Sequence, residues 1–155
     1  MEEKFGIKGK IEYELRDVDG NLKDSGVVDN TITALMDAHV ADQMSDSTDA
    51  QIGYIALGTG TGETSASTDL ATYSAGTFLG LSGTATQGTA GADNDVVYSG
   101  YWGAGVGTAS ITEAGLFLGS ASARSDMMTY NDALTVTKGA SDTLKIDWTV
   151  TFGAS

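Results

Sequence analysis

Carboxylates are the side chains in this sequence that come closest to an arrangement for catalysis. Asp93 and Asp95 form a closely spaced pair, and two carboxyl groups can act as general acid and base, as in glycoside hydrolysis. Asp-rich loops are common, however, and nothing marks this pair as buried. Glu113 is the better single candidate, because it interrupts the apolar segment ASITEAGLFLG. If it faces inward it must find a partner, and otherwise it marks the solvent or interface side of its strand.

Metal and thiol chemistry lack the side chains that they need. The 155-residue chain contains no cysteine and a single histidine, His39. Zinc sites built from Cys and His are therefore excluded, and so is a disulfide framework. His39 lies near an apolar stripe, and we interpret it as a packed or surface residue. We expect no cofactor, no metal site and no catalytic centre, so an enzyme is the least favoured class of function.

Two motifs resemble ligand-binding loops, and each has a simpler explanation. The segment DVDG at residues 17–20 has the carboxylates of a calcium loop, but its glycine spacing does not fit an EF-hand. We interpret it as a tight hairpin turn at Asp19 and Gly20. The segment GTGTGETSAST at residues 58–68 lacks the lysine and the following helix of a phosphate-binding loop. We interpret it as an exposed, mobile loop.

The distribution of charge excludes two classes of partner. The formal net charge is -13, and from Asp24 to Ala123 there are eleven acidic residues and no Lys or Arg. Nucleic-acid binding needs basic residues that neutralise phosphates, and anionic membranes repel the same surface. We therefore expect neither partner. The first residues lack the pattern of a secretory signal, and no apolar run reaches the roughly 18 residues that span a membrane. The outward-facing Lys4, Lys8 and Lys10 form the one basic cluster available for an acidic partner.

The two ends of the chain carry the clearest strand patterns. Apolar and charged side chains alternate through residues 5–15, as expected of a strand that buries one face. The same alternation returns in residues 144–152. We expect the two strands to pack near each other, which would bring together Phe5, Ile7, Ile11 and Tyr13 with Trp148, Val150 and Phe152. After the hairpin turn, residues 22–28 return antiparallel to the first strand.

The middle of the chain predicts one helix and several short strands. Apolar residues recur at three- and four-residue spacing in a short helix near residues 32–44. Residues 52–57 read as a short strand, and we expect a flexible loop at residues 83–95. The strand at residues 111–118 has apolar side chains on both faces, so it is either buried on both sides or meets a partner on one.

These elements predict a single all-β domain over residues 1–155. Short, mainly antiparallel strands joined by Gly-rich turns are typical of a β-sandwich or a barrel-like closure around one core. Proline, which often blocks the edges of sheets, is absent from the chain. We therefore expect the edges to be covered in an assembly.

Four segments resemble small accessory structural proteins of tailed bacteriophages and related viruses. They are NTIT at residues 30–33, YIALGTGT at 54–61, ITEAGLF at 111–117 and DTLKIDWTVTF at 142–152. The resemblance implies a virion protein without an active site, above all a capsid decoration or cement protein on the exterior of the shell. A tail or baseplate accessory protein is the alternative. It also implies the major capsid protein or another virion protein as partner, and a homo-oligomer, with a trimer favoured.

Aromatic residues support an alternative from a different class. Tyr98, Tyr101 and Trp102 lie in loop-like, Gly-rich sequence, and exposed aromatic rings near carboxylates are typical of surfaces that stack on sugars. A carbohydrate- or host-receptor-binding module of a viral fibre would use them in this way. The other interpretation, which we favour, is that these rings fill the core.

Overall fold

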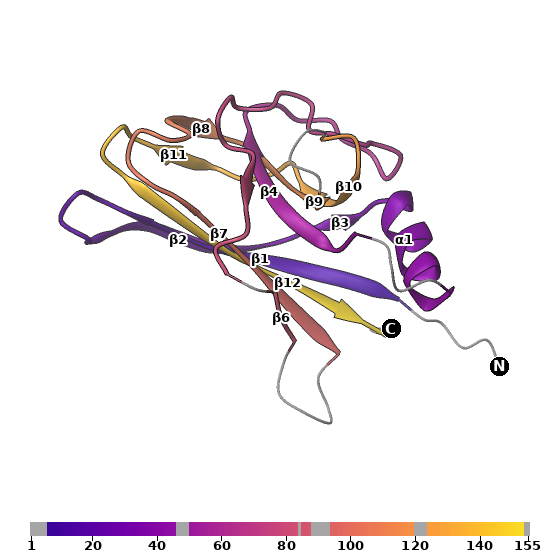
Figure 1. Cartoon of the computed structure of the whole chain (residues 1–155). Helices are drawn as coiled ribbons and strands as arrows, with labels where there is room; N and C mark the ends of the chain where they lie inside the picture. The colour runs from indigo at the N-terminus through magenta and orange to yellow at the C-terminus, as the bar shows by residue number, and fades with distance from the viewer. Residues whose placement is uncertain (1–5, 46–49, 84, 88–93, 120–123, 154–155) are drawn as a thin grey trace.

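The computed structural model describes residues 6–45, 50–83, 85–87, 94–119 and 124–153. Its strands form two five-stranded sheets and one two-stranded sheet, and every pairing is antiparallel (Figure 1). The part of the chain that the structure describes contains one helix, α1 (Ala34–Ser45), close to the predicted position. The predicted all-β class is confirmed, and the arrangement is sandwich-like.

The two large sheets draw their strands from distant parts of the chain. Sheet A has the order β2-β1-β12-β7-β6, with β1 (Ile7–Arg16), β2 (Leu22–Asp29), β6 (Thr86–Gln87), β7 (Asp95–Trp102) and β12 (Thr143–Phe152). Sheet B has the order β3-β10-β9-β4-β5, with β3 (Thr31–Ile32), β4 (Ile52–Gly58), β5 (Leu79–Gly80), β9 (Glu113–Leu118) and β10 (Met127–Asn131). Sheet C pairs β8 (Ala109–Ile111) with β11 (Val136–Lys138).

The centre of sheet A is the pairing of β1 with β12. The register places Ile7 opposite Phe152 and Ile11 opposite Trp148, and it continues without a break along both strands. The predicted contact between the two patterned strands is therefore confirmed, except at Phe5, which lies outside the described residues. Both strands alternate in burial because each presents one apolar face to the core and one polar face to solvent.

The hairpin that joins β1 to β2 is organised by Asp17. Its Oδ1 accepts backbone N–H groups from Asp19 and Asn21, each at 2.9 Å. Gly20 is the one described residue of this turn with a positive φ, 83°. The predicted turn at Asp19 and Gly20 is therefore present, and the Asp17 side chain stabilises it by accepting N–H groups of its own loop.

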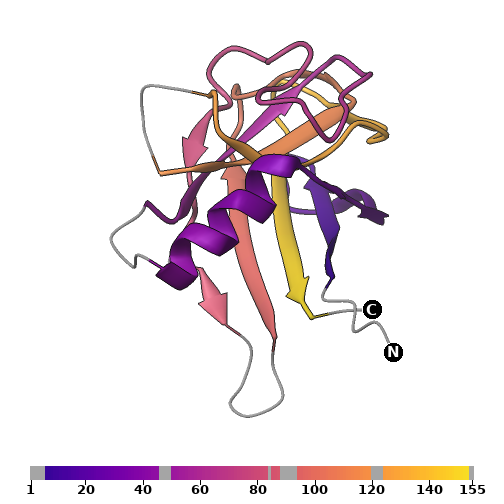
Figure 2. The ribbon, with the colours of Figure 1, turned by 90° about the vertical axis from the view of Figure 1, so that its right-hand side faces the viewer.

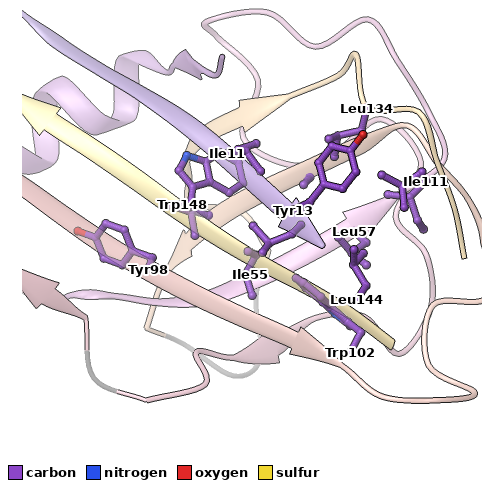
Figure 3. Close-up of a cluster of buried hydrophobic side chains, with 14 of the residues drawn as sticks. Ile11, Tyr13, Ile55, Leu57, Tyr98, Trp102, Ile111, Leu134, Leu144 and Trp148 are labelled. Atoms are coloured by element: carbon purple, nitrogen blue, oxygen red, sulfur yellow. The ribbon is translucent and has the colours of Figure 1, made fainter. Parts of the chain in front are cut away.

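The main core lies between sheets A and B. Side chains from the inner face of sheet A, such as Ile11 and Trp148, contact Ile55 and Leu57 of β4 and Leu116 of β9 (Figure 3). Each of these five residues is fully buried. Burial of this kind supplies the dominant favourable contribution to folding.

Strand β9 is buried on both faces, the first of the two alternatives expected for it. Phe117 points away from the main core and packs with Ala56, Leu70 and Met127 in a second buried cluster. Phe78 meets the Phe117 ring edge-on, with a centroid distance of 5.4 Å. The connection between β4 and β5 therefore covers the far side of sheet B.

An ionic cluster ties the opening hairpin to the turn before β12. The buried Lys138 donates from Nζ to the carbonyl oxygens of Gly103 and Asp142, at 2.9 and 2.6 Å. The Asp142 carboxylate accepts from Lys23 Nζ and from the Gly139 backbone N–H, each at 2.7 Å. The hydrogen bond from Lys23 is the largest cause that lowers the pKa of Asp142. The cluster therefore links Lys23 of β2 and Lys138 of β11 to the turn that leads from β11 into β12.

Helix α1 crosses one side of the sandwich and passes in front of β7 in the view of Figure 2. It packs on β10 and buries Met36. No helix among the described residues is long and apolar enough to cross a membrane. Within the predicted flexible loop at 83–95, β6 pairs with β7 and Asp95 begins β7, whereas residues 84 and 88–93 lie outside the described residues.

Candidate interaction surface

The outer face of sheet A is the surface that points away from sheet B. Residues that lie directly opposite each other in an antiparallel pair point to the same side, so the register assigns the members of this face. Two rows across the sheet are Val27, Glu12, Asp147, Ser99 and Ser25, Glu14, Lys145, Tyr101. The other members are Lys8, Lys10, Arg16, Leu22, Asp29, Asp95, Val97, Thr143, Thr149 and Thr151. All of them are exposed or half-buried.

Ion pairs run along the strands of this face. Lys10 lies 2.9 Å from Glu12 and Lys145 lies 3.0 Å from Asp147, and the lysine side chains are 50% and 52% exposed. The hydrogen bond to each carboxylate raises the pKa of its lysine. Exposed pairs of this kind contribute little to stability because water screens them. Their charged groups therefore stay accessible to a partner.

The outer face of sheet A differs in charge from the rest of the chain. It carries four of the eight Lys and Arg residues but only five of the 21 Asp and Glu residues, a net charge of -1 in a chain of -13. The rest of the chain therefore carries most of the net negative charge, and this face repels an acidic partner less than the chain as a whole does. This face combines both signs of charge with the exposed Tyr101 and Val27, at 52% and 62%.

The structure brings together three of the predicted site residues. Lys8 and Lys10 of β1 and Tyr101 of β7 share the outer face of sheet A. Tyr101 lies directly opposite Lys145, which the sequence did not single out. Lys4 lies outside the described residues.

The prediction of an exposed aromatic surface is wrong for Tyr98 and Trp102. Both point inward from β7, and their exposed fractions are 8% and 0% (Figure 3). Trp102 donates from Nε1 to the carbonyl oxygen of Thr77 at 2.9 Å. Burial raises the pKa of Tyr98 to about 12. The segment is a paired strand instead of a loop, so alternate side chains enter the core, as the favoured interpretation expects.

Quenching of tryptophan fluorescence checks this burial. Trp102 and Trp148 are each 0% exposed, so acrylamide should quench the native protein several-fold less than the urea-unfolded chain. Equal quenching of the two states would contradict the buried placement of both rings. The Trp102→Phe and Trp148→Phe variants assign any residual quenching to one ring.

Glu113, the single residue favoured for chemistry, is fully buried at the start of β9. Its Oε1 accepts the backbone N–H groups of Gly60 and Thr72 at 2.9 and 2.8 Å, and its Oε2 accepts that of Ala71 at 3.0 Å. The carboxylate therefore faces inward and finds its partners in the backbone. A Cβ added at Gly58 would overlap it, which explains one glycine of the GTGTG run.

The connection after β4 is held by this carboxylate, so its interpretation as an exposed, mobile loop is wrong for the part around Gly60. Glu63 is only 9% exposed, and its Oε1 shares the N–H of Ala71 with Glu113. The Glu63 Oε2 is buried without a hydrogen-bond partner among the described residues. The site is therefore built from backbone N–H donors of the loop itself, three on Glu113, one of them shared with Glu63. Its place in the structure is to anchor the loop.

The remaining predicted positions form no shared site. Asp95 lies at the end of the outer face of sheet A, and Asp93 lies outside the described residues. His39 is half-buried on α1, beside a hollow of about 360 Å³ that Asp42 and Met128 also line. No three His, Cys, Asp or Glu side chains of the described ranges lie close enough to hold a metal ion together.

A larger hollow of about 610 Å³ lies where β4 and β5 of sheet B approach β6 and β7 of sheet A. Its lining is mostly apolar, with Ile52, Leu81, Val96 and Tyr98. Among the described residues no charged side chain lines it, so they offer little for a phosphate or a carboxylate.

Comparison of the chain with protein-family models, with curated proteins and with solved structures finds no match.

Proposed function

We propose that this chain is a non-enzymatic structural protein of a virus particle, which binds the exterior of the capsid through the outer face of sheet A and stabilises the shell. The observation that carries the proposal is the net charge of -1 on that face in a chain of -13. Electrostatic complementarity guides an encounter and fixes its orientation. An acidic protein therefore presents this face to an acidic or mixed-charge partner.

The segments that resemble virion accessory proteins support the viral part of the proposal. Two of them, at residues 54–61 and 111–117, meet at the Glu113 carboxylate, where Gly60 donates its backbone N–H. The two segments therefore form an internal anchor of the fold, and their shared carboxylate is not an exposed reactive group. A third, at residues 142–152, contains the central strand of sheet A. A tail or baseplate accessory protein is the alternative location for the same face.

A binding assay with matched variants tests the docking face. The triple variant Lys8→Gln, Lys10→Gln, Lys145→Gln makes the outer face of sheet A more acidic by three charges. We expect it to bind at least tenfold more weakly to particles that lack the protein, measured by co-sedimentation at low salt, because it loses its attraction to acidic groups. Wild-type binding should also weaken as salt rises.

The control is a variant with the same change in charge elsewhere. Ala38, Met44 and Thr61 are exposed positions away from this face, and their replacement by Glu should leave binding within about twofold of wild type. Equal losses in both triple variants would point to net charge instead of a docking face. Absence of wild-type binding at low salt would reject the proposal itself.

A further inference from the structure

Strand β2 forms an edge of sheet A, and no described strand pairs with its outer side. Asn30 donates its N–H to the carbonyl oxygen of Gly9 at 3.3 Å. Because the bonded pairs of an antiparallel ladder alternate, the register then turns Asp24, Gly26 and Val28 toward β1. The N–H and C=O groups of Ser25 and Val27 therefore point outward.

Asp29 confirms this direction and marks where the free edge ends. Its carbonyl oxygen, which the same alternation turns outward, accepts a hydrogen bond from the side-chain amide of Asn131. Beyond this point the chain enters β3 of sheet B. The N–H and C=O groups of Ser25 and Val27 are thus the outward positions at which both the donor and the acceptor are free.

Exposed apolar side chains gather along the same edge. Of the five large hydrophobic residues that are exposed in the described part of the chain, three belong to this hairpin: Val18, Leu22 and Val27. Natural edge strands are commonly protected by proline, by an inward charge or by cover from another element. Of these, β2 has one inward charge, Asp24, whereas no described element covers Ser25 and Val27. Free backbone groups next to exposed valine and leucine are typical of an edge that pairs with another strand.

We propose that the occupant is a second copy of this chain, which pairs with β2 in antiparallel orientation so that the two copies share one continuous sheet. Across the new pairing, only residues whose backbone N–H and C=O groups point outward can exchange hydrogen bonds with each other. Since the carbonyl of Asp29 is already engaged, the matching register places Gly26 opposite Gly26. Ser25 of each copy then exchanges two hydrogen bonds with Val27 of the other.

Charge favours a second copy in this register. In this register Lys23 of one copy lies opposite Asp29 of the other, so the charges at the two ends of the pairing have opposite signs, with Lys23 also bound to Asp142 of its own chain. Asp24 lies opposite Val28. Residues 7–29 carry four basic and six acidic residues, a net charge of -2, whereas the whole chain carries -13. Repulsion between two copies at this hairpin is therefore weaker than the net charge of the whole chain would produce.

The pairing predicts a dimer. Antiparallel pairing of one edge with itself is closed by a two-fold axis, so no further copy can add at β2. This differs from the trimer that the resemblance implies, and a mass measurement decides between them. The proposal does not depend on capsid binding, because it concerns the free protein.

Sedimentation equilibrium at micromolar to 100 µM protein tests the inference, with two variants of one residue. Val27→Pro removes an outward N–H and no bond to β1, and edge strands tolerate proline at such positions. Val27→Lys keeps the N–H but places a charge on each side of the two-fold axis. We expect about twice 15.9 kDa for the wild type and at least a tenfold weaker dimer for both variants, with unchanged circular dichroism.

Met44→Lys is the matched control, because Met44 is 86% exposed on α1, away from the edge. It should remain a dimer. In the wild-type dimer the amides of Ser25 and Val27 should exchange hydrogen slowly, and in Val27→Lys those two should become fast while Gly26 and Val28 stay protected. A wild-type monomer at 100 µM, a trimer, or an unweakened dimer in both Val27 variants would overturn the inference.

Discussion

Replacement of Glu113 by alanine should lower the free energy of unfolding by about 2–4 kcal/mol, because it leaves the N–H groups of Gly60 and Thr72 without an acceptor at about 1–3 kcal/mol each, while Ala71 keeps Glu63. A domain of ordinary stability has only about 5–15 kcal/mol in total. Urea unfolding followed by circular dichroism measures the loss. The variant should also release the loop around Gly60, which limited proteolysis detects.

Two companion variants make the Glu113 result specific. Glu113→Gln keeps one acceptor oxygen for Gly60 and Thr72, and Ala71 still has Glu63, so its loss should be clearly smaller than that of Glu113→Ala. Glu12→Ala removes an exposed carboxylate from the outer face of sheet A and should leave the urea midpoint near that of the wild type. If Glu113→Ala were no more destabilising than Glu12→Ala, the loop would not depend on this carboxylate.

The two buried tryptophans should respond differently to the same substitution. Trp102→Phe should lower the free energy of unfolding by about 2–4 kcal/mol, because it removes ring volume and also leaves the carbonyl oxygen of Thr77 without its Nε1 donor. The Nε1 of Trp148 is buried without a partner among the described residues. Trp148→Phe removes this unpaired donor together with the ring volume, so we expect a loss of at most about 1–2 kcal/mol.

The comparison of the two variants isolates the hydrogen bond. Both rings are 0% exposed, so the loss of volume is similar at each site. Urea unfolding measures both variants, and the same dependence of the unfolding free energy on urea is used for each. Trp148→Phe should be more stable than Trp102→Phe by about 1–3 kcal/mol. Equal losses would mean that the Trp102 N–H adds nothing net to stability.

Local pattern was enough to predict the elements that determine sheet A. Residues 5–15, with Gly9 as the one break in the apolar row, and residues 144–152 alternate, and alternation follows from burial of one face alone. The turn at Gly20 and the helix at Ala34–Ser45 likewise depend on neighbours in sequence. The pairing of β1 with β12 could be predicted as well, because each had one strong apolar face that needed a matching one.

The candidate sites were harder to predict because their residues lack a one-sided pattern. In VVYSGYW at residues 96–102, both faces of the strand carry an aromatic ring, so alternation alone does not say whether Tyr101 or its neighbours Tyr98 and Trp102 face the core. The partners of Glu113 are backbone N–H groups, which every residue except proline possesses. Only the glycines around residues 58–60 hinted that another group approaches the backbone there.

The sequence predicted that an unprotected sheet edge exists, but not which strand forms it. The absence of proline indicated unprotected edges somewhere in the chain. Which strand forms an edge depends on the order of strands in the sheet, and that order joins segments more than 100 residues apart, as in β1 with β12. The periodicity of a segment does not say which other segment, more than 100 residues away, it lies beside.

The central place of β12 has a consequence for synthesis of the chain. β12 follows every other strand of sheet A in the sequence, yet it lies between β1 and β7. While the ribosome is still adding residues 143–152, the β1–β2 hairpin and β7 have no strand to join them, so the sheet can close only after that segment emerges. Pairings between distant segments form slowly, and the waiting hairpin exposes unpaired edges to other nascent chains. High expression and elevated temperature should therefore favour aggregation during translation, while refolding of the finished chain at low concentration avoids it.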